Sequence, residues 1–91
     1  MEETIRLRED VEWREVEGEV VALDLQTSRY LAINSSGRFL WQALSTGATR
    51  SHLVGELTAN FGIAEDVARR DVDDFISMLA SSKLLADGDA I

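Results

Sequence analysis

Cysteine and proline are both missing from this 91-residue sequence, and histidine occurs once. Without cysteine the chain forms no disulfide, has no thiolate nucleophile and cannot bind zinc through sulfur. His52 has no second histidine or cysteine with which to form a metal site, so it is interpreted as a surface residue of a helix. No nucleophile–base pair, metal-ligand spacing or phosphate-binding glycine loop is present either. The sequence therefore predicts no catalysis, no cofactor and no bound metal.

Basic side chains are also scarce, since nine Lys and Arg oppose 17 Asp and Glu and the net charge is −8. A chain with this charge is repelled by phosphate backbones, which makes nucleic acid a poor candidate ligand. No apolar run approaches the ~20 residues that span a bilayer. The acidic N-terminus lacks the basic and apolar regions of a signal peptide. These absences predict a cytoplasmic protein without membrane contact.

The length favours a single domain over residues 1–91, because a chain of this size buries only about 60–65% of its unfolded surface and cannot close a second core. Residues 1–10 and 86–91 are candidates for loosely held ends. Within the first segment, Ile5 and Leu7 alternate with polar residues. This pattern leaves open a short edge strand or a loose arm.

Three segments have the alternating pattern of β-strands. Residues 11–16 alternate apolar and charged side chains, with Val11, Trp13 and Val16 or its neighbours expected to face the core. Residues 19–25 and 29–33 are rich in large apolar side chains and are joined by a short polar turn. We expect a three-stranded antiparallel sheet in which residues 29–33 form one edge.

Three helices are expected after the strands. Asn34 caps the first, which covers about residues 36 to 45, and Thr49 caps the second. The apolar residues of the second helix recur every four positions, at Leu53, Leu57 and Phe61. The third helix covers about residues 64 to 82. Its predicted apolar stripe is Ala68, Val72, Phe75 and Leu79. The expected fold class is therefore α+β.

The most distinctive spacing in the sequence links Leu23-Asp24, Tyr30, Asn34, Gly37 and Trp41. In order and spacing these residues resemble the PqqD family, and the resemblance covers the chain from about residue 13 to residue 85. It implies a winged helix-turn-helix-like fold that recognises ribosomally made, modified peptides. In that family the leader segment of a precursor peptide adds as a fourth, antiparallel strand beside the third strand, and the third helix forms the other wall of the groove.

The resemblance also implies partners. Free-standing members of this size are similar either to PqqD itself, which serves a radical-SAM enzyme, or to the leader-binding protein of lasso peptide pathways. The latter delivers the precursor to a cysteine-protease-like leader peptidase before a cyclase closes the ring. We favour the lasso pathway.

The candidate binding residues follow from this arrangement. The edge strand has unpaired backbone groups that can hold an extended peptide. Apolar pockets are expected between the strand and the third helix, and Asp71 and Asp74, three residues apart, are expected to receive a leader lysine or arginine. The predicted peptide-binding residues are Arg29, Tyr30, Leu31, Ala32, Ile33, Val67, Asp71, Asp74, Phe75 and Met78.

Structural roles remain open for several of these residues. Tyr30 can instead pack across the hairpin, the two aspartates can form a solvated helix face, and Met78 can fill the core. Two other functions also remain open. One is a winged-helix DNA-binding regulator, although the third helix has five acidic residues against Arg69 and Arg70. The other is a subunit that stabilises an enzyme without touching its substrate.

Overall fold

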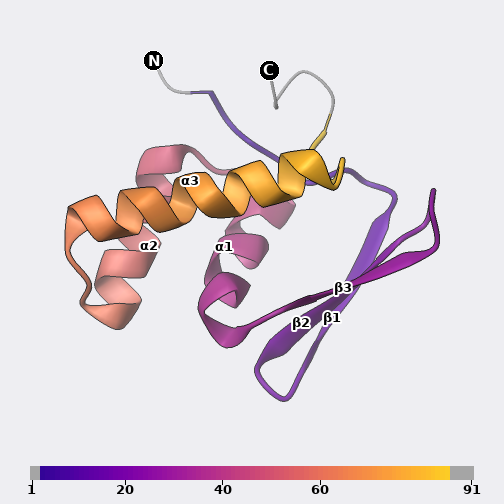
Figure 1. Ribbon diagram of the computed structural model, residues 1–91, viewed down its shortest axis with the longest axis horizontal. Coiled ribbons are helices and arrows are strands. Elements are labelled where there is room, and N and C mark those ends of the chain that lie inside the picture. Colours follow the sequence, from indigo (N-terminus) through magenta and orange to yellow (C-terminus); the bar gives the residue numbers. More distant parts are fainter. Residues whose placement is uncertain (1–2, 87–91) are drawn as a thin grey trace.

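The computed structural model describes residues 3–86. Three antiparallel strands in the order β1-β2-β3 precede three helices. Figure 1 shows the helices gathered beside the sheet, with α3 lying across the others. The elements are β1 (Val11–Val16), β2 (Glu19–Asp24), β3 (Arg29–Ile33), α1 (Ser35–Thr46), α2 (Arg50–Phe61) and α3 (Glu65–Ser81). The predicted α+β class and the order of elements are confirmed.

The two faces of the sheet differ because successive side chains of a strand point to opposite sides. Along β2, Val20, Ala22 and Asp24 are buried, whereas Val21 and Leu23 are only half-buried. Helix α1 packs against β2 and β3. The helices therefore cover the face that contains Val20 and Ala22, called the inner face here. Within residues 3–86 no helix packs on the opposite, outer face.

Strand β1 differs from its prediction. Val11 is its only buried residue, and Val16, which was expected to face the core, is 44% exposed. The two valines are five positions apart, so the alternation of a strand puts them on opposite faces. Trp13 lies on the same side as Val11 and is more than one third exposed, with its ring edge-on to that of Trp41 at 6.3 Å between centroids.

The predicted helix caps are confirmed. The side-chain oxygen of Asn34 accepts a hydrogen bond from the Gly37 N–H at 3.0 Å, and the Thr49 hydroxyl accepts one from the His52 N–H at 3.1 Å. Each cap satisfies one of the free N–H groups of the first turn. Gly62 ends α2 in the left-handed conformation at φ 65°, which glycine adopts without steric cost. Local capping chemistry therefore sets where these helices begin and end.

The buried stripes of α2 and α3 depart from the predicted ones. Phe61 is 43% exposed although Leu53 and Leu57 are buried. At 100° per residue, eight residues turn a helix about 80° past two full turns, so a strict four-residue repeat leaves the core. On α3 the buried residues are Ala68, Val72, Ile76 and Leu79. Ile76 thus takes the central position expected for Phe75, which is half-buried.

No helix within residues 3–86 is long and apolar enough to cross a membrane.

The N-terminal segment is tied into the core rather than loose. Ile5 and Leu7 are buried and form isolated bridges with Ala48 and Leu85. The Arg8 N–H donates to the Leu84 carbonyl at 2.9 Å. The segment 5–8 therefore holds both the α1–α2 connection and the end of the described chain. Ala86, the first residue of the C-terminal segment that was expected to be loose, donates its N–H to the Arg6 carbonyl at 2.8 Å. Residues 1–2 and 87–91, which complete the two segments expected to be loose, lie outside the described residues.

Candidate functional site

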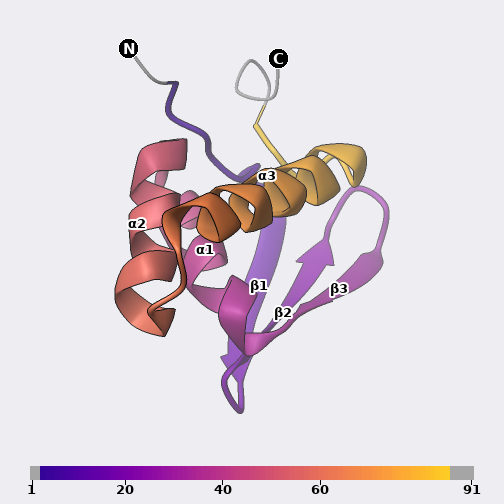
Figure 2. The same cartoon turned by 60° about the vertical axis from the view of Figure 1, so that its left-hand side comes forward.

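Strand β3 is an edge of the sheet, and within residues 3–86 it pairs only with β2. Leu31 and Ile33 lie opposite the inner-face residues Ala22 and Val20. The inner-face side chains of β3 therefore point toward the helices, and Tyr30 and Ala32 point outward. In Figure 2, β3 is at the open side of the sheet, with the C-terminal half of α3 above it. The region between the free edge and α3, which contains the hollow lined by Arg29, Leu31 and Ser82, is called the groove here.

Two hollows lie along this groove. The first, here called the hairpin pocket, has a volume of about 170 Å³ and lies at the beginning of β3. Its lining residues are Ala22, Asp24, Arg29, Tyr30, Leu31, Ser82 and Leu84. The second, called the junction pocket, has a volume of about 560 Å³ and lies beyond the end of β3, where α1, α2 and α3 meet. Its lining residues are Asn34, Gly37, Leu40, Leu57, Phe61, Ile63, Asp71, Asp74 and Phe75.

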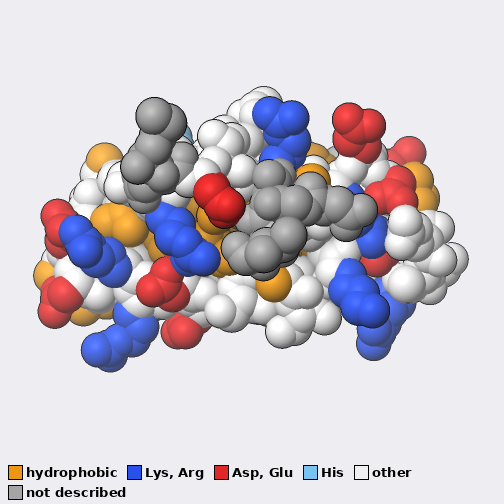
Figure 3. Space-filling model, turned by 90° about the horizontal axis from the view of Figure 1, so that it is seen from above, with side chains coloured by type: hydrophobic (Ala, Val, Ile, Leu, Met, Phe, Trp, Pro, Cys, Tyr) orange, Lys and Arg blue, Asp and Glu red, His pale blue; other side chains and the backbone are white. Residues whose placement is uncertain are grey.

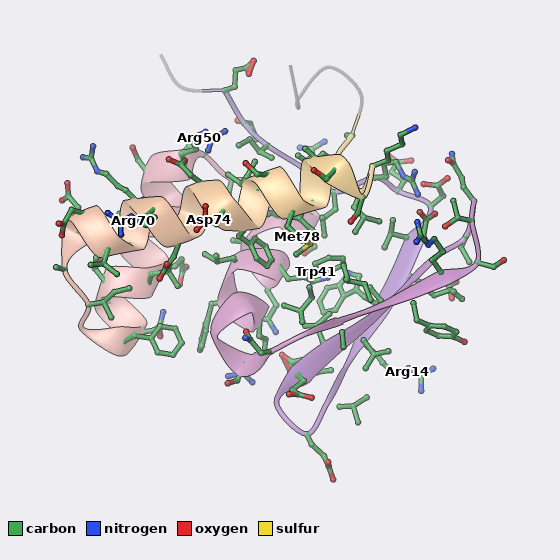
Figure 4. All side chains as sticks on the ribbon, in the orientation of Figure 1. Arg14, Trp41, Arg50, Arg70, Asp74 and Met78 are labelled. Atoms are coloured by element: carbon green, nitrogen blue, oxygen red, sulfur yellow. The ribbon has the colours of Figure 1, made fainter. Side chains whose placement is uncertain are left out.

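One face of α3 joins the two pockets. Asp71, Phe75, Met78 and Ser82 follow at spacings of four, three and four residues, which puts them on one side of the helix. Met78 is half-buried and packs against the core, on the side of α3 that faces Trp41 in Figure 4. The predicted helix residues Asp71, Asp74 and Phe75 are brought together in the junction pocket. Val67, one turn earlier, is 45% exposed and lines neither pocket.

Gly37, in the first turn of α1, packs closely against two side chains at the junction pocket. A Cβ atom on Gly37 would lie 2.6 Å from a methyl carbon of Ile33 and 3.1 Å from the ring of Phe75. Both distances are shorter than ordinary van der Waals contact. Only glycine lets the first turn of α1 lie directly against Ile33 and Phe75. The shape of the junction pocket thus depends on glycine at position 37, because any larger residue would push Ile33 or Phe75 away.

Charges at the junction pocket are uncompensated. Asp71 and Asp74 are exposed, and neither forms an ion pair within the described part of the chain. Their neighbour Asp73 differs, because its carboxylate accepts a hydrogen bond from Arg50 at 2.6 Å on another side of α3. Elsewhere on the surface, acidic and basic side chains are interspersed, as one face of the molecule in Figure 3 shows. Because Asp71 and Asp74 lack such a partner, the junction pocket combines an apolar floor with a negative rim.

Asp24 is a buried carboxylate at the hairpin pocket. It accepts hydrogen bonds from Arg8 at 2.5 Å and from the Gln26 N–H at 2.9 Å. Burial acts to raise the pKa of this carboxyl group, but hydrogen bonds from Gln26, Arg8 and Thr27 and the Arg8 charge outweigh it, so the pKa of Asp24 is lowered. Asp24 is thus stabilised in its ionised form, and its ion pair with Arg8 connects the N-terminal segment to the β2–β3 turn.

Of the two roles expected for Tyr30, tight packing across the hairpin is not seen, and contact with a bound peptide stays a prediction. Its side chain is 76% exposed, so it does not pack tightly across the hairpin. It borders both the hairpin pocket and a shallow hollow of about 610 Å³ on the outer face. That second hollow is lined in part by Val16, Val21 and Leu23. Tyr30 therefore lies at the boundary between the groove and the open face of the sheet.

Several lining residues were not expected to be site residues. Leu40, Leu57, Phe61 and Ile63 form the junction pocket floor, and Ser82 and Leu84 close the hairpin pocket. The sequence offered one signal for such a residue: because a four-residue repeat cannot stay buried along a helix, Phe61 could have been expected to leave the core and to line a surface pocket. Within residues 3–86 no group of three or more histidine or acidic side chains is arranged to hold a metal ion. The arrangement can hold an extended chain with side chains in both pockets.

Comparison with known proteins identifies relatives of this fold. The sequence model of the family described as Coenzyme PQQ synthesis protein D (PqqD) matches residues 19–85. A solved structure described as TbiB1 in complex with the TbiA(beta) leader peptide is 28% identical, with a TM-score of 0.84 over 90% of this chain and 95% of that one. A second, described as lasso peptide synthetase B1 complexed with the leader peptide, shares the fold at 21% identity and a TM-score of 0.80, over 90% and 96% of the two chains. Among curated protein sequences none matches significantly.

Proposed function

The chain belongs to the PqqD family, and we propose that it binds the leader segment of a ribosomally made precursor peptide as an added strand beside β3. The observation that carries this proposal is the free edge of β3 with a partly apolar pocket near each end. An extended peptide placed there pairs its backbone with Arg29–Ile33 and directs alternate side chains toward α3. The similar TbiB1 structure is described as a complex with a leader peptide, and this supports the binding of a leader peptide here.

The energetics require the pockets as well as the strand edge. About six added hydrogen bonds at roughly 0.5–1.5 kcal/mol each barely offset the ordering of a flexible peptide at about 1–2 kcal/mol per residue. Burial of two or three large side chains at about 25 cal/mol per Å² adds several kcal/mol. Affinity and sequence preference therefore come from side chains that enter the hairpin and junction pockets.

The binding residues in this proposal are those of the groove. Arg29, Leu31 and Ile33 lie on the inner-face side of β3, and Ala32 contributes its backbone to the edge. Phe75 and Met78 form the apolar wall on α3, with Asp71 and Asp74 beside them. Tyr30 borders the hairpin pocket and stays in the proposed groove. Of the four predicted residues that line neither pocket, which are Ala32, Ile33, Val67 and Met78, we leave out only Val67, because it is 45% exposed and lies one turn before Asp71 on α3.

We further propose that the chain acts as a non-catalytic adaptor in a lasso peptide pathway. It holds the precursor for a separate cysteine-protease-like leader peptidase, after which a cyclase closes the ring. Both structural neighbours are described as complexes with a leader peptide, and one of the two descriptions names a lasso peptide synthetase. For this reason we propose this pathway over PqqD-type service to a radical-SAM enzyme. Regulation through DNA binding is disfavoured, because α3 has uncompensated carboxylates where a recognition helix needs positive charge.

A displayed library of random 20-residue peptides, selected on the immobilised chain, tests peptide binding whatever the sequence of the natural leader. We expect saturable binding of the enriched peptides. The variant Phe75→Ala should weaken it by about tenfold or more, because a large part of one pocket wall is removed. Titration by fluorescence anisotropy measures the change. Ile33→Asp, which puts a charge beside the strand edge, should also weaken it.

The control is Val54→Ala, which truncates a half-buried side chain on α2 outside both pockets. It should leave peptide affinity unchanged to within about twofold. Circular dichroism verifies that each variant is folded. Unchanged affinity in folded Phe75→Ala and Ile33→Asp would remove the groove as the binding site.

A further inference from the structure

We infer that the junction pocket is a subsite for a lysine or arginine side chain of the bound peptide. This inference rests on the proposed function and adds to it a chemical preference at one defined end of the groove. The pocket is the larger of the two hollows that lie along the groove, at about 560 Å³ against about 170 Å³. A long side chain fits this pocket. The floor of the pocket is apolar, and its rim contains the two carboxylates of Asp71 and Asp74.

The floor of the pocket suits an aliphatic stem. Leu40 and Leu57 are buried beneath it, and Ile63 and Phe75 are half-buried at its sides. Phe61 adds an exposed aromatic ring, which is held edge-on to Phe39 at 5.5 Å between centroids. Lysine and arginine bury their methylene stems on such surfaces and keep the charged group at the edge. A cation near an aromatic face is also favoured.

The rim of the pocket selects the charge. Asp71 and Asp74 both border the pocket and have no ion-pair partner within residues 3–86. A purely apolar ligand side chain would cover these carboxylates partly without replacing the water they lose. A guanidinium or ammonium group replaces that water with an ion pair. The pocket therefore favours a basic side chain over leucine or phenylalanine of similar size.

The position of the pocket predicts where the basic residue lies in the peptide. Asn34 and Gly37 line the pocket just after β3 ends. A peptide antiparallel to β3 has its N-terminal side at that end. The hairpin pocket at the other end contains Arg29, and its one carboxylate, Asp24, is already paired with Arg8. We therefore expect the basic residue on the N-terminal side of the paired segment and a neutral apolar residue on the C-terminal side.

The experiment compares peptide preferences of three proteins. Random 20-residue peptides are selected on the wild-type chain, on the double variant Asp71→Asn/Asp74→Asn and on the charge-matched double variant Asp66→Asn/Asp73→Asn. Both variants change the net charge by two units, but Asp66 and Asp73 line no part of the junction pocket. Wild type and the control should enrich Lys or Arg at one position N-terminal to the apolar ones. Asp71→Asn/Asp74→Asn should lose that enrichment and keep the apolar positions.

Titration of one selected basic peptide then measures the size of the effect. We expect it to bind Asp71→Asn/Asp74→Asn about five- to tenfold more weakly at about 0.05 M salt, with the difference within about twofold at about 1 M salt. An equal basic preference in all three proteins, or its loss in both double variants, overturns the subsite. Enriched peptides that bind in the groove without any basic preference overturn it while the proposed function stands. Absence of any peptide sensitive to Phe75→Ala overturns both.

Discussion

Single residues set the two ends of the groove. At one end the missing side chain of Gly37 lets α1 lie against Ile33 and Phe75. At the other, the Asp24 carboxylate holds the β2–β3 turn through Gln26 and ties it to Arg8 of the N-terminal segment. Both residues position the backbone: Gly37 lets α1 pack against β3 and α3, and Asp24 holds the β2–β3 turn by hydrogen bonds. The groove thus has a defined shape without a ligand, and this would lower the ordering cost of the proposed peptide binding.

The lowered pKa of Asp24 leads to a pH-dependent prediction. Because its folded pKa lies below the ordinary 3.8, the charged carboxylate contributes stability that is fully present above pH 3.8 and is lost as pH falls through the folded pKa. Asp24→Asn should therefore be less stable than wild type at neutral pH, and the gap should narrow below pH 3.8. Urea denaturation at pH 7 and at about pH 3 measures it. The exposed Glu12→Gln serves as control, and a gap that is equal at both pH values would contradict the role of the charge.

At the scale of the element, β3 is a short edge strand of five residues. Short edges are less prone to pair with other chains indiscriminately. In the proposed complex the pockets near its two ends restrict pairing further, because the peptide would be held in the register that fills both. Strand β1 is the other edge of the sheet, but neither groove pocket borders its free side. The two edges therefore differ in what they can bind.

Strand addition predicts an alternating response to backbone methylation of the peptide. In an antiparallel strand, successive N–H groups point alternately toward the partner and away from it. A set of selected peptides, each N-methylated at one position, should lose about tenfold or more in affinity at every second position of the paired segment. The intervening positions should change little. Equal small effects along the whole peptide, measured by titration, would contradict pairing with β3 and leave only side-chain binding.

At the scale of the whole molecule, the core and the groove share residues. The buried N-terminal pair Ile5 and Leu7 bridges the chain to Ala48 and Leu85. Leu84, next to the second bridge, is also a wall of the hairpin pocket. The end of the described chain is therefore held in place by its beginning, although neither segment belongs to a regular strand or helix. Loss of the N-terminal contacts should loosen the pocket as well as the core.

The N-terminal contacts predict a large stability effect from a residue outside every regular element. Leu7→Ala should lower the free energy of unfolding by about 2–4 kcal/mol, because it opens a cavity beside Leu85. Val16→Ala, at an exposed valine of the outer face, should cost about 0.5 kcal/mol or less. Chemical denaturation of both variants checks the comparison. Similar small losses in the two would show that the N-terminal segment is not part of the core.

Much of the fold could be predicted from the sequence because its signals are local. Asn34 and Thr49 cap their helices through backbone groups three residues away. The polar turn after Asp24 joins two alternating runs into a hairpin. The errors arose where a local repeat was extended too far. Phe61 leaves the core because a helix does not repeat every four residues, and Val16 faces outward because five positions separate it from Val11.

By itself the sequence determined the strands, the helices and the acidic character of α3, since each depends on neighbours within a few positions. The free edge of β3 could be expected from the order of the strands, but the pairing of the whole sheet decides it. Only the tertiary structure decided which of these residues form a site. The junction pocket unites Leu40 of α1, Leu57 of α2 and Phe75 of α3, while Val67 on the same helix as Phe75 remains outside. The crossing of three helices sets that grouping, and it depends on packing between residues far apart in the chain.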